Sequence, residues 1–470
     1  MKRYDAIAIG TGSVMSVVSG LIARNPEAKV AVIDKDEPGG ICLTRGCIPS
    51  KILLYPAELI YEIKRAEEFG ISVEIKDIDF GKIMQRMRRI IEKDIREIEK
   101  SLKEHPSIDY YQAKASFVAP YTLEVNGERI KSEKIFIGSG SKPLVPPIRG
   151  LKETGYLTSD TLLKLEEMPG SLCIIGGGYI AMEYGNFFAR LGSKVKIVEA
   201  LDRVLYNEEE ELSRAVQEEM SRVAELYTGH RVVEVKKRGN SKAVVAERSD
   251  GKRVEIEAEE ILVAVGRASN SDLLKPEKGG IKTDARGWII VNDYLETSQP
   301  GVYALGDANG RFMLKNVANY EARVVFYNAV LGKKVKMDYS VVPHAVFTQP
   351  EIASVGLKEK EAVEKFGKEN VLIGYERYEN TGKGIAMNVE GFVKVIVSKE
   401  GEILGAHIAG VSASVLIQEV VNLMKLGAGY EAVLEAMHIH PALSEAVQRA
   451  FSSLMTPEEY HREFDKNSPP

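Results

Sequence analysis

Residues 171–181 read SLCIIGGGYIA, and the expected architecture of the chain follows from this stretch. Its apolar first half predicts a strand that is buried on both faces of a parallel sheet. Its second half completes the pattern G-x-G-x-x-A, in which Gly176 and Gly178 are the two glycines. The next strand ends at Glu199, 23 residues after Gly176. This strand–helix–strand unit predicts a dinucleotide-binding fold, and its carboxylate favours NAD because it would repel the 2′-phosphate of NADP.

The same unit occurs at the start of the chain, where residues 4–12 read YDAIAIGTG. Gly10 permits the tight turn, and Gly12 lets a pyrophosphate approach the backbone. Asp34, at the end of the next strand, can accept a hydrogen bond from a ribose 2′-hydroxyl. Met15 stands where a third small residue is usual, and we expect it to crowd the packing of helix on strand. Two such units predict two Rossmann-like domains in an α/β chain.

Residues 39–51 read GGICLTRGCIPSK and contain Cys42 and Cys47, two of the three cysteines in the chain. Pro49 suits the first turn of a helix, so both thiols should lie at a helix N-terminus, where partial positive charge lowers a thiol pKa. Two such thiols can form an exchangeable disulfide. A structural zinc site would need four Cys or His ligands, and none lies nearby in pairs, so no metal is expected. The other alternative is that Cys42 and Cys47 are buried and inert. For Cys173, which lies in an apolar strand, we adopt this interpretation of a buried, inert cysteine.

The bulk composition argues against several classes of protein. With 470 residues, the chain should hold several domains. A formal net charge of −5 provides no basic surface for nucleic acid. No apolar run approaches the ~20 residues that cross a bilayer, so no membrane partner is expected. Three cysteines in so long a chain argue against a secreted disulfide scaffold and favour a cytoplasmic location.

The rest of the chain supplies two further polar features. Residues 301–307, GVYALGD, predict a short strand that ends in Asp307 at the edge of a sheet where ligands bind. From about residue 339, strands and then helices predict a separate α+β domain. Near its end, His440 and Glu445 have the composition of a proton carrier and a carboxylate that orients it. Nicotinamide moves a hydride and a dithiol also exchanges two electrons, so a flavin is the natural relay between them.

At this point the motifs resemble those of a known family. Residues 39–51 resemble the motif G-G-T-C-L-N-x-G-C-(I/V)-P-(S/T)-K of the flavin-dependent pyridine nucleotide–disulfide oxidoreductases. Residues 440–445, HPALSE, resemble the C-terminal H-P-x-x-S-E of that family. The likeness covers essentially the whole chain and is greatest to dihydrolipoamide dehydrogenases. It implies an FAD-binding domain with the redox disulfide at 1–148, an NAD-binding domain at 149–270, a central segment at 271–338 that completes the FAD site, and a C-terminal α+β dimerisation domain at 339–470.

The resemblance also implies roles for individual residues. Cys42 would be the thiol that meets the substrate, and Cys47 the thiol that contacts the flavin. Lys51 would lie near flavin N5 and pair with Glu183, and Tyr179 would cover the flavin until nicotinamide displaces it. The residues implied for binding FAD and NAD are Gly10, Gly12, Asp34, Lys51, Ser139, Gly140, Gly176, Gly178, Tyr179, Ile180, Glu199, Gly266, Gly306, Asp307 and Leu314.

The family also implies a partner. His440 and Glu445 would form a base pair that reaches the active site of the other subunit, so a homodimer with shared active sites is expected. The leading hypothesis is a dihydrolipoamide dehydrogenase, with a lipoyl group as substrate and a 2-oxoacid dehydrogenase complex as partner.

Two alternatives stay open at this point. Residues 314–319, LKNVAN, and residues 384–387 look more like mycothione-reductase-type members, which reduce a low-molecular-weight disulfide with NAD(P)H. Outside the enzymes, the chain could be a non-catalytic flavin-binding subunit, although the intact cysteine pair with His440 and Glu445 argues against that hypothesis.

Overall fold

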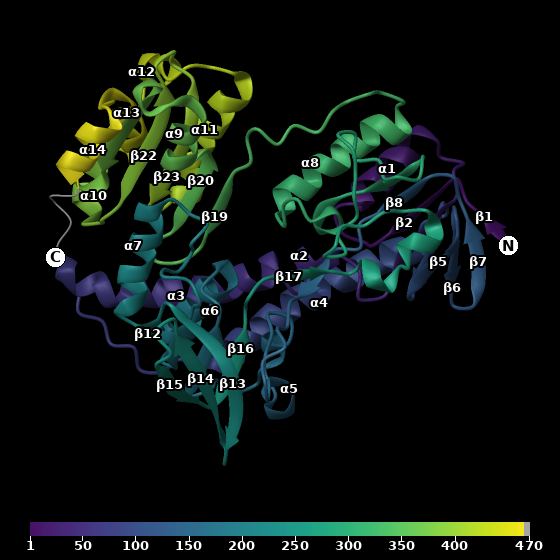
Figure 1. The fold of residues 1–470 in the computed structure, drawn as a ribbon, viewed down its shortest axis with the longest axis horizontal. Helices are drawn as coiled ribbons and strands as arrows, with labels where there is room; N and C mark the ends of the chain where they lie inside the picture. The colour runs from purple at the N-terminus through teal and green to yellow at the C-terminus, as the bar shows by residue number, and fades with distance from the viewer. Residues whose placement is uncertain (465–470) are drawn as a thin grey trace.

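Two parallel sheets, each carrying one of the glycine patterns, lie at the right and at the bottom of the molecule in Figure 1. The computed structural model describes residues 1–464; residues 465–470, the end of the predicted dimerisation domain, lie outside the described residues. The first sheet, in the order β18-β8-β2-β3-β4, consists of β2 (Ala6–Ile9), β3 (Val30–Asp34), β4 (Ile108–Gln112), β8 (Ile135–Ile137) and β18 (Val302–Ala304). Ala6, Ile7 and Ala8 are fully buried, because this central strand is covered on both faces.

Helices cover the first sheet and continue from its strand ends. The two that pack together against it are α1 (Met15–Arg24) and α8 (Lys315–Val325). Met15, where we expected crowding, is the first residue of α1 and packs half-buried against the core of this unit. The helix therefore forms with a large residue at the third position of the glycine pattern.

The second sheet repeats this arrangement with the order β12-β11-β10-β16. Its strands are β10 (Ser171–Ile175), β11 (Lys194–Val198), β12 (Ala224–Tyr227) and β16 (Glu260–Val263), all parallel. Its helices are α6 (Tyr179–Leu191), directly after Gly178, and α7 (Glu210–Ser221). Cys173 is fully buried in β10, as its apolar surroundings predicted.

Glycine is required at the first position of each pattern for the same steric reason. Gly10 and Gly176 have φ of 103° and 109°, in the region that side chains rarely adopt. A Cβ on Gly10 would lie 2.2 Å from the carbonyl oxygen of Gly138, and one on Gly176 would lie 2.4 Å from that of Ala264. In both units a neighbouring backbone segment therefore crosses directly over the strand end, which no other residue type would allow.

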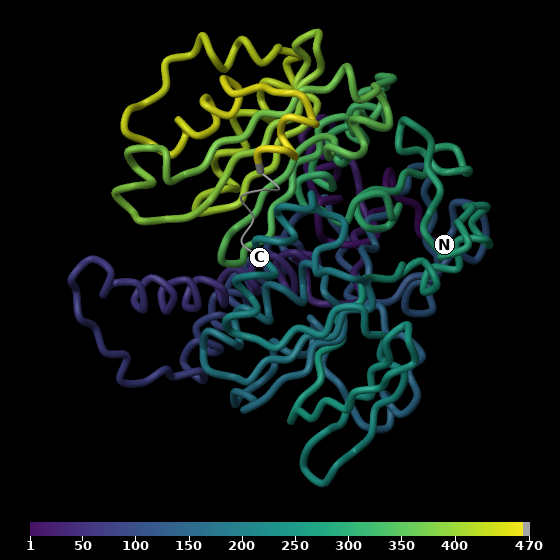
Figure 2. The backbone as a smooth tube through the Cα atoms, turned by 60° about the vertical axis from the view of Figure 1, so that its left-hand side comes forward, coloured from purple at the N-terminus to yellow at the C-terminus, as the bar shows by residue number. Residues whose placement is uncertain are grey.

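Two long helices connect the two units. They are α3 (Cys47–Arg65), which follows the short α2 (Gly40–Thr44), and α4 (Phe80–Glu104). Figure 2 shows them as a hairpin whose connection projects from the molecule. The buried residues of α4 are Phe80, Met84, Met87, Ile91, Ile95 and Leu102. These positions recur at helical spacing, so α4 packs by one apolar stripe.

Smaller antiparallel elements flank the two units. One sheet combines β1 (Lys2–Arg3), β5 (Ala115–Ala119), β6 (Thr122–Val125) and β7 (Glu128–Lys131), in which only β1 and β7 run parallel. Another combines β13 (His230–Arg238), β14 (Ser241–Arg248) and β15 (Arg253–Ala258). The chain passes between the two units through the pair β9 (Ser141–Pro143) and β17 (Arg267–Ser269), and the short α5 (Leu151–Thr154) follows β9.

The C-terminal unit is an α+β domain at the upper left of Figure 1. An extended segment, residues 331–343, leads to it from the first unit. Its antiparallel sheet has the order β19-β20-β23-β22-β21, with β19 (His344–Val346), β20 (Ile352–Gly356), β21 (Val371–Arg377), β22 (Phe392–Ser398) and β23 (Ile403–Ala409). Its helices are α9 (Glu359–Phe366), α10 (Gly382–Met387), α11 (Ala413–Leu426), α12 (Glu431–Glu435), α13 (Ser444–Ser452) and α14 (Pro457–Phe464). Within residues 1–464, none of the helices combines the length and apolarity that a bilayer crossing requires.

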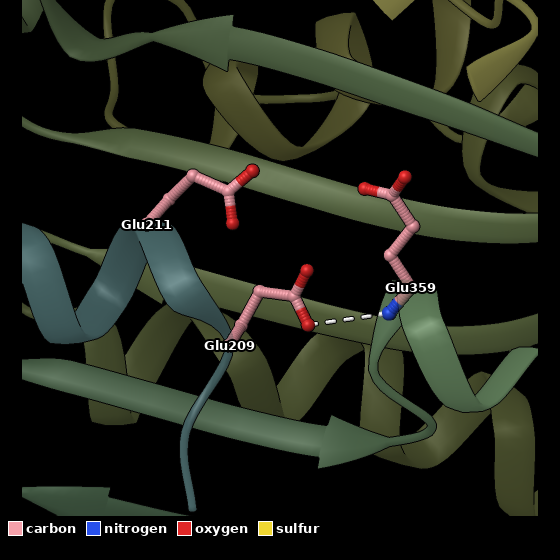
Figure 3. Close-up of side chains that lie close together, drawn as sticks. All are labelled: Glu209, Glu211 and Glu359. Atoms are coloured by element: carbon pink, nitrogen blue, oxygen red, sulfur yellow. Dashed lines mark hydrogen bonds between the residues drawn. The ribbon is translucent and has the colours of Figure 1, made fainter. Parts of the chain in front are cut away.

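A buried lysine joins the C-terminal domain to the second unit. Lys394 of β22 has a side chain only 1% exposed, and its Nζ lies 2.7 Å from carboxylate oxygens of Glu209, Glu211 and Glu359. Glu209 also accepts the backbone N–H of Glu359 at 3.2 Å, the contact drawn in Figure 3. Burial alone would raise the pKa of Glu211, but the Lys394 charge outweighs it and lowers that pKa to about 2. The three carboxylates drawn in Figure 3 therefore surround the ammonium group of Lys394, which the figure does not draw. This ammonium group links the C-terminal domain to the second unit.

Replacing Lys394 by Met should lower the stability of the protein at neutral pH by about 3–5 kcal/mol, because it leaves buried carboxylates without their cation. Urea unfolding followed by circular dichroism measures the change. The matched control is Lys336→Met, because Lys336 pairs with Asp293 at an exposed site, where a salt bridge contributes less than about 1 kcal/mol. A loss in Lys394→Met no larger than in this control would contradict the structural role of the buried charge.

Candidate active site

One cavity of about 2310 Å³ extends from the first glycine pattern past the two cysteines to the second glycine pattern. Every residue that the sequence suggested for FAD or NAD lines it, as do Cys42, Cys47 and Glu183. His440 and Glu445, both within the described residues, are not among its lining. A pocket for one drug-sized ligand measures roughly 300–1,000 Å³, so this cavity has room for larger ligands approaching from both units.

The two thiols lie on separate short stretches of helix. Cys42 belongs to α2, whereas Cys47 is the first residue of α3, directly after Gly46. Both are free thiols in this structure, and a hydrogen bond joins them. The two thiols therefore come from different helices and meet at the cavity wall.

The pair is electrostatically unequal. The hydrogen bond from Cys42 lowers the pKa of Cys47 to about 7, and the Lys51 ammonium adds to this against the opposing effect of burial. The same hydrogen bond, together with burial, raises the pKa of Cys42. Our expectation that a helix N-terminus lowers both thiol pKa values is therefore wrong for Cys42, which lies outside α3 and donates its proton to Cys47.

An ion pair fixes the cavity wall beside Cys47. Lys51, one turn further along α3, places its Nζ 2.7 Å from both carboxylate oxygens of Glu183 on α6. The backbone N–H of Phe347 donates to the same carboxylate at 3.2 Å, and the Phe347 ring lies under the Lys51 ammonium at 4.5 Å. Three segments that are far apart in sequence meet at this pair, one from each of the three units.

Hydrogen bonds hold Asp34 in place where the first unit lines the cavity. Its Oδ2 accepts the backbone N–H of Thr11 at 2.9 Å and the Thr11 hydroxyl at 2.6 Å. Its Oδ1 accepts the N–H of Asp36 at 3.1 Å. Burial raises the pKa of this carboxyl, and these three hydrogen bonds act in the opposite direction. A carboxylate fixed in this way at the end of β3 can accept further hydrogen bonds from ligand hydroxyl groups.

Glu199 occupies the equivalent place in the second unit. Its carboxylate accepts the N–H of Gly177 at 2.5 Å and that of Leu201 at 2.8 Å. A Cβ on Gly177 would lie 2.9 Å from Glu199, so this glycine makes room for the carboxylate. Both units thus end their second strand with an anchored carboxylate that lines the cavity.

The cavity wall also fits phosphate-bearing ligands. A Cβ on Gly178 would meet no atom of the described chain within 4 Å, and one on Gly12 would meet only Gly40, at 3.6 Å. Protein packing therefore does not explain these glycines, whereas close approach of a ligand does. The buried hydroxyl of Ser139, which has no hydrogen-bond partner among the described residues, also lies in the lining. Bare backbone and an unpaired hydroxyl at the same wall match what a bound dinucleotide requires.

Asp307 lies just after β18, in a 3₁₀ turn (Gly306–Asn309) that a buried carboxylate supports. Glu321 is fully buried and accepts the N–H of Gly306 at 2.5 Å and the side-chain amide of Asn309 at 3.0 Å. The Ser141 hydroxyl donates to Asp307, and the Arg267 guanidinium lies 3.8 Å from it. The loop therefore presents Asp307 to the cavity with its orientation fixed from both sides.

The structure adds residues that the sequence did not indicate. The Tyr179 hydroxyl donates to Oε1 of Glu208 at 2.6 Å, and His344 Nε2 lies 2.8 Å from the same oxygen. Glu208 opens a run of four glutamates, and such a run ordinarily indicates a solvated surface. No sequence signal could have distinguished it from its neighbours, because its partner His344 lies 136 residues away along the chain.

His440 and Glu445 form their expected contact away from the cavity. His440 Nδ1 lies 3.0 Å from Glu445 Oε1, and the other carboxylate oxygen accepts the N–H of Ala442 at 3.0 Å. Because a carboxylate can only accept, Nδ1 carries the proton and Nε2 of the neutral ring is left as the basic nitrogen. The hydrogen bond from His440 lowers the pKa of Glu445. The His440 side chain is 73% exposed, so its basic nitrogen is available to a group outside this protomer.

Comparison with known proteins gives the same picture over the full length. A family model described as pyridine nucleotide-disulphide oxidoreductase matches residues 4–322, and the dimerisation domain of that description matches residues 342–451. Mycothione reductase of Mycobacterium tuberculosis is 35% identical over 468 residues, covering 97% of this chain and 100% of that protein. Dihydrolipoyl dehydrogenase of Thermus scotoductus is 35% identical over 463 residues, covering 97% and 98%. The solved structure of the HOCl-induced flavoprotein disulfide reductase RclA from Escherichia coli matches with a TM-score of 0.84 at 28% identity, covering 96% of this chain and 99% of that one.

The unequal thiols should be visible in a pH titration of the protein reduced with excess dithiothreitol and then freed of it anaerobically. Thiolate absorbance in the ultraviolet should rise first with an apparent pKa of about 7, and the second thiol should titrate only in strongly alkaline solution. Lys51→Met should move the first apparent pKa up to about 8, because the nearest cation is lost. Lys142→Met, which removes an exposed lysine paired with Asp272, should leave the curve unchanged. Two thiols that titrate together near 9 would contradict the assignment.

Proposed function

The chain belongs to the pyridine nucleotide-disulphide oxidoreductase family, and from this premise we propose that it exchanges electron pairs between NAD(H) and a dithiol or disulfide substrate. Members of this family contain FAD and use NAD(P)H. The observation that carries the proposal is the unequal pair Cys42 and Cys47, which lines one cavity together with both glycine patterns. A non-catalytic subunit would have no need of a thiol with a pKa near neutrality beside a lysine.

The proposed cofactor sites follow the cavity wall. Gly10, Gly12, Asp34, Ser139 and Asp307 would hold FAD, whereas Gly176, Gly178 and Glu199 would hold NAD. When bound, FAD supplies the two-electron acceptor that lies between dithiol and nicotinamide chemistry. Glu199 supports NAD over NADP, because its carboxylate would repel a 2′-phosphate. The domain boundaries at residues 148, 270 and 338 belong to the same proposal.

The proposed thiol chemistry uses five side chains, those of the two cysteines, Lys51, His440 and Glu445. In the oxidised form, a substrate thiolate attacks Cys42 Sγ, the Cys42–Cys47 bond breaks, and Cys47 leaves as a thiolate that Lys51 stabilises. The second substrate thiolate then attacks the substrate sulfur bound to Cys42, which forms the substrate disulfide and releases Cys42. Nε2 of a His440 takes up the proton of the first attacking thiol and releases it to solvent, and it then takes up the proton of the second attacking thiol and returns it to Cys42. Glu445 stabilises the imidazolium that forms and keeps the basic nitrogen directed outward.

We propose that the His440 in each active site comes from a second copy of the chain. His440 does not line the cavity of its own protomer, and its neighbours Met437 and Ile439 expose 101% and 77% of their surface. Exposed apolar side chains in the domain that matches the family's dimerisation domain support a homodimer at this face. The few cysteines of the chain support a cytoplasmic location.

The leading substrate is a dihydrolipoyl group, which would make the protein a dihydrolipoamide dehydrogenase and a 2-oxoacid dehydrogenase complex its partner. The full-length similarity to a dihydrolipoyl dehydrogenase supports this choice. A second candidate is the reduction of a low-molecular-weight disulfide. Lys315 favours it, because its charge acts on the Cys42 thiol and would attract an anionic small disulfide. Similarity to a mycothione reductase supports the same candidate.

The test of the proposed function is an anaerobic titration of the purified holoprotein with NADH, followed by turnover assays. NADH should bleach the flavin absorbance and produce a long-wavelength band from the Cys47 thiolate next to the flavin. NAD-dependent oxidation of dihydrolipoamide should then exceed the reduction of small symmetric disulfides at least about tenfold in kcat/KM. Cys42→Ser should keep the band and lose turnover. An unchanged spectrum would refute the enzyme, and faster turnover of small disulfides would select the second candidate.

The shared active site can be tested with mixed dimers. Cys42→Ser and His440→Gln homodimers should each lose at least about a hundredfold in turnover, because each lacks one essential group. Heterodimers, coexpressed with two affinity tags and purified through both, should regain about half of wild-type turnover, since one of their two sites is complete. If Cys42 and His440 acted within one protomer, the heterodimer would be as inactive as its parents.

A further inference from the structure

Tyr179 is held by a carboxylate that belongs to neither glycine pattern. The tyrosine is the first residue of α6, lines the cavity beside Glu183, and is 39% exposed. Its hydroxyl reaches Oε1 of Glu208 at 2.6 Å. The family resemblance implies that this ring covers the flavin where nicotinamide must dock. Whatever holds the hydroxyl therefore influences how readily the ring moves aside.

Glu208 is almost completely buried and fully engaged. Its side chain is 2% exposed, with His344 Nε2 at 2.8 Å from Oε1 and the Ser354 hydroxyl donating to Oε2 at 3.0 Å. Burial alone would raise the pKa of Glu208, but His344 and the other donors outweigh it and lower that pKa to about 2. Tyr179 thus donates to a buried carboxylate that is charged at neutral pH, and such hydrogen bonds are about twice as strong as neutral ones.

The partners of Glu208 belong to the C-terminal domain. His344 lies on β19 and Ser354 on β20. On the next strand, β23, His407 Nδ1 lies 3.1 Å from the Ser354 hydroxyl. His407 Nε2 lies 3.0 Å from the carbonyl oxygen of Leu357 and must donate to it, because a carbonyl only accepts. The chain of contacts runs from the cavity wall through Glu208 into the sheet of the other domain.

Glu208 is not free to follow the tyrosine. Glu209 and Glu211 in the same segment are bound by the buried Lys394, and Glu209 also accepts the N–H of Glu359. Figure 3 shows this segment entering α7 beside α9 of the C-terminal domain. Because its neighbours are anchored across the domain boundary, Glu208 is a fixed point, and Tyr179 must release it in order to move.

We propose that Glu208 is a positioning residue that holds Tyr179 across the nicotinamide side of the cavity and anchors it to the C-terminal domain. NAD(H) then binds its adenine half without hindrance, whereas its nicotinamide half must break the Tyr179–Glu208 hydrogen bond. The inference rests on the proposed function and on the place over the flavin that the family resemblance implies for Tyr179. The inference adds Glu208 as the residue that determines how much free energy is needed to move Tyr179 away from the flavin.

Two ligands separate the two halves of this binding event. NAD⁺ contains the nicotinamide, and ADP-ribose lacks it, so only NAD⁺ has to displace Tyr179. The dissociation constants of both should be measured by isothermal titration calorimetry on the oxidised holoprotein. Tyr179→Phe, which keeps the ring and removes the donor, should bind NAD⁺ about tenfold more tightly, given the strength of hydrogen bonds to charged groups. Its affinity for ADP-ribose should stay within about twofold of wild type.

Glu208→Gln should also lower the dissociation constant of NAD⁺ relative to that of ADP-ribose, because it removes the charge of the carboxylate and weakens the acceptor of the Tyr179 hydrogen bond. In the double variant, Glu208→Gln should add nothing to the effect of Tyr179→Phe, since both act on one contact. The matched control is Tyr227→Phe, which removes another tyrosine–glutamate hydrogen bond, from Tyr227 to Glu225 at 2.8 Å, outside the cavity lining. It should leave both dissociation constants unchanged.

The outcomes separate this inference from the proposed function. Equal changes for NAD⁺ and ADP-ribose in Glu208→Gln would mean a general effect on the domain and would overturn the inference, as would additive effects in the double variant. If Glu208→Gln does not fold, an unchanged NAD⁺ to ADP-ribose ratio in Tyr179→Phe still overturns it. Failure of the wild-type holoprotein to bind NAD⁺ or to be reduced by NADH would instead refute the proposed function itself.

Discussion

The ion pair between Lys51 and Glu183 is the contact on which the cavity depends. It joins α3, which begins with Cys47, to α6, which begins directly after Gly178 of the second glycine pattern. The N–H of Phe347 brings the C-terminal domain to the same carboxylate. Lys51 also lowers the pKa of Cys47, so one cation both aligns the three units and tunes the thiol between them. A change in domain orientation at this point would therefore alter the chemistry of the thiol as well as the shape of the site.

Buried charged groups are also paired at two other places along the boundary between the second unit and the C-terminal domain. Lys394 lies among three carboxylates, and His344 and Ser354 support Glu208. In each case buried acids of the second unit pair with a group of the C-terminal domain, and Glu359 adds a carboxylate of the C-terminal domain itself beside Lys394. Buried charges of this kind tolerate little displacement, because separation leaves each partner without compensation in a medium of low dielectric constant. Polar contacts thus fix the position of the second unit relative to the C-terminal domain.

The sequence contained most of the local information and little of the long-range information. The two glycine patterns, their following carboxylates and the apolar strands were sufficient to predict two Rossmann-like units, because turn geometry and strand burial are local requirements. The α/β class with a C-terminal dimerisation domain is confirmed by the family models. The roles assigned to individual site residues stay predictions. The proton shared by Cys42 and Cys47 was missed, because it depends on how α2 is placed against α3. Glu208 and Lys394 were missed for a related reason: His344 and Glu209, which pair with them, lie more than a hundred residues away in the chain.

The exposure of His440 has a consequence at low protein concentration. If a complete site draws Cys42 from one chain and His440 from another, a dissociated protomer retains its cavity but lacks its base. Dilution would then lower turnover per chain while leaving the KM of the remaining sites unchanged, because each surviving dimer is intact. Activity would then follow the law of mass action for dimer assembly.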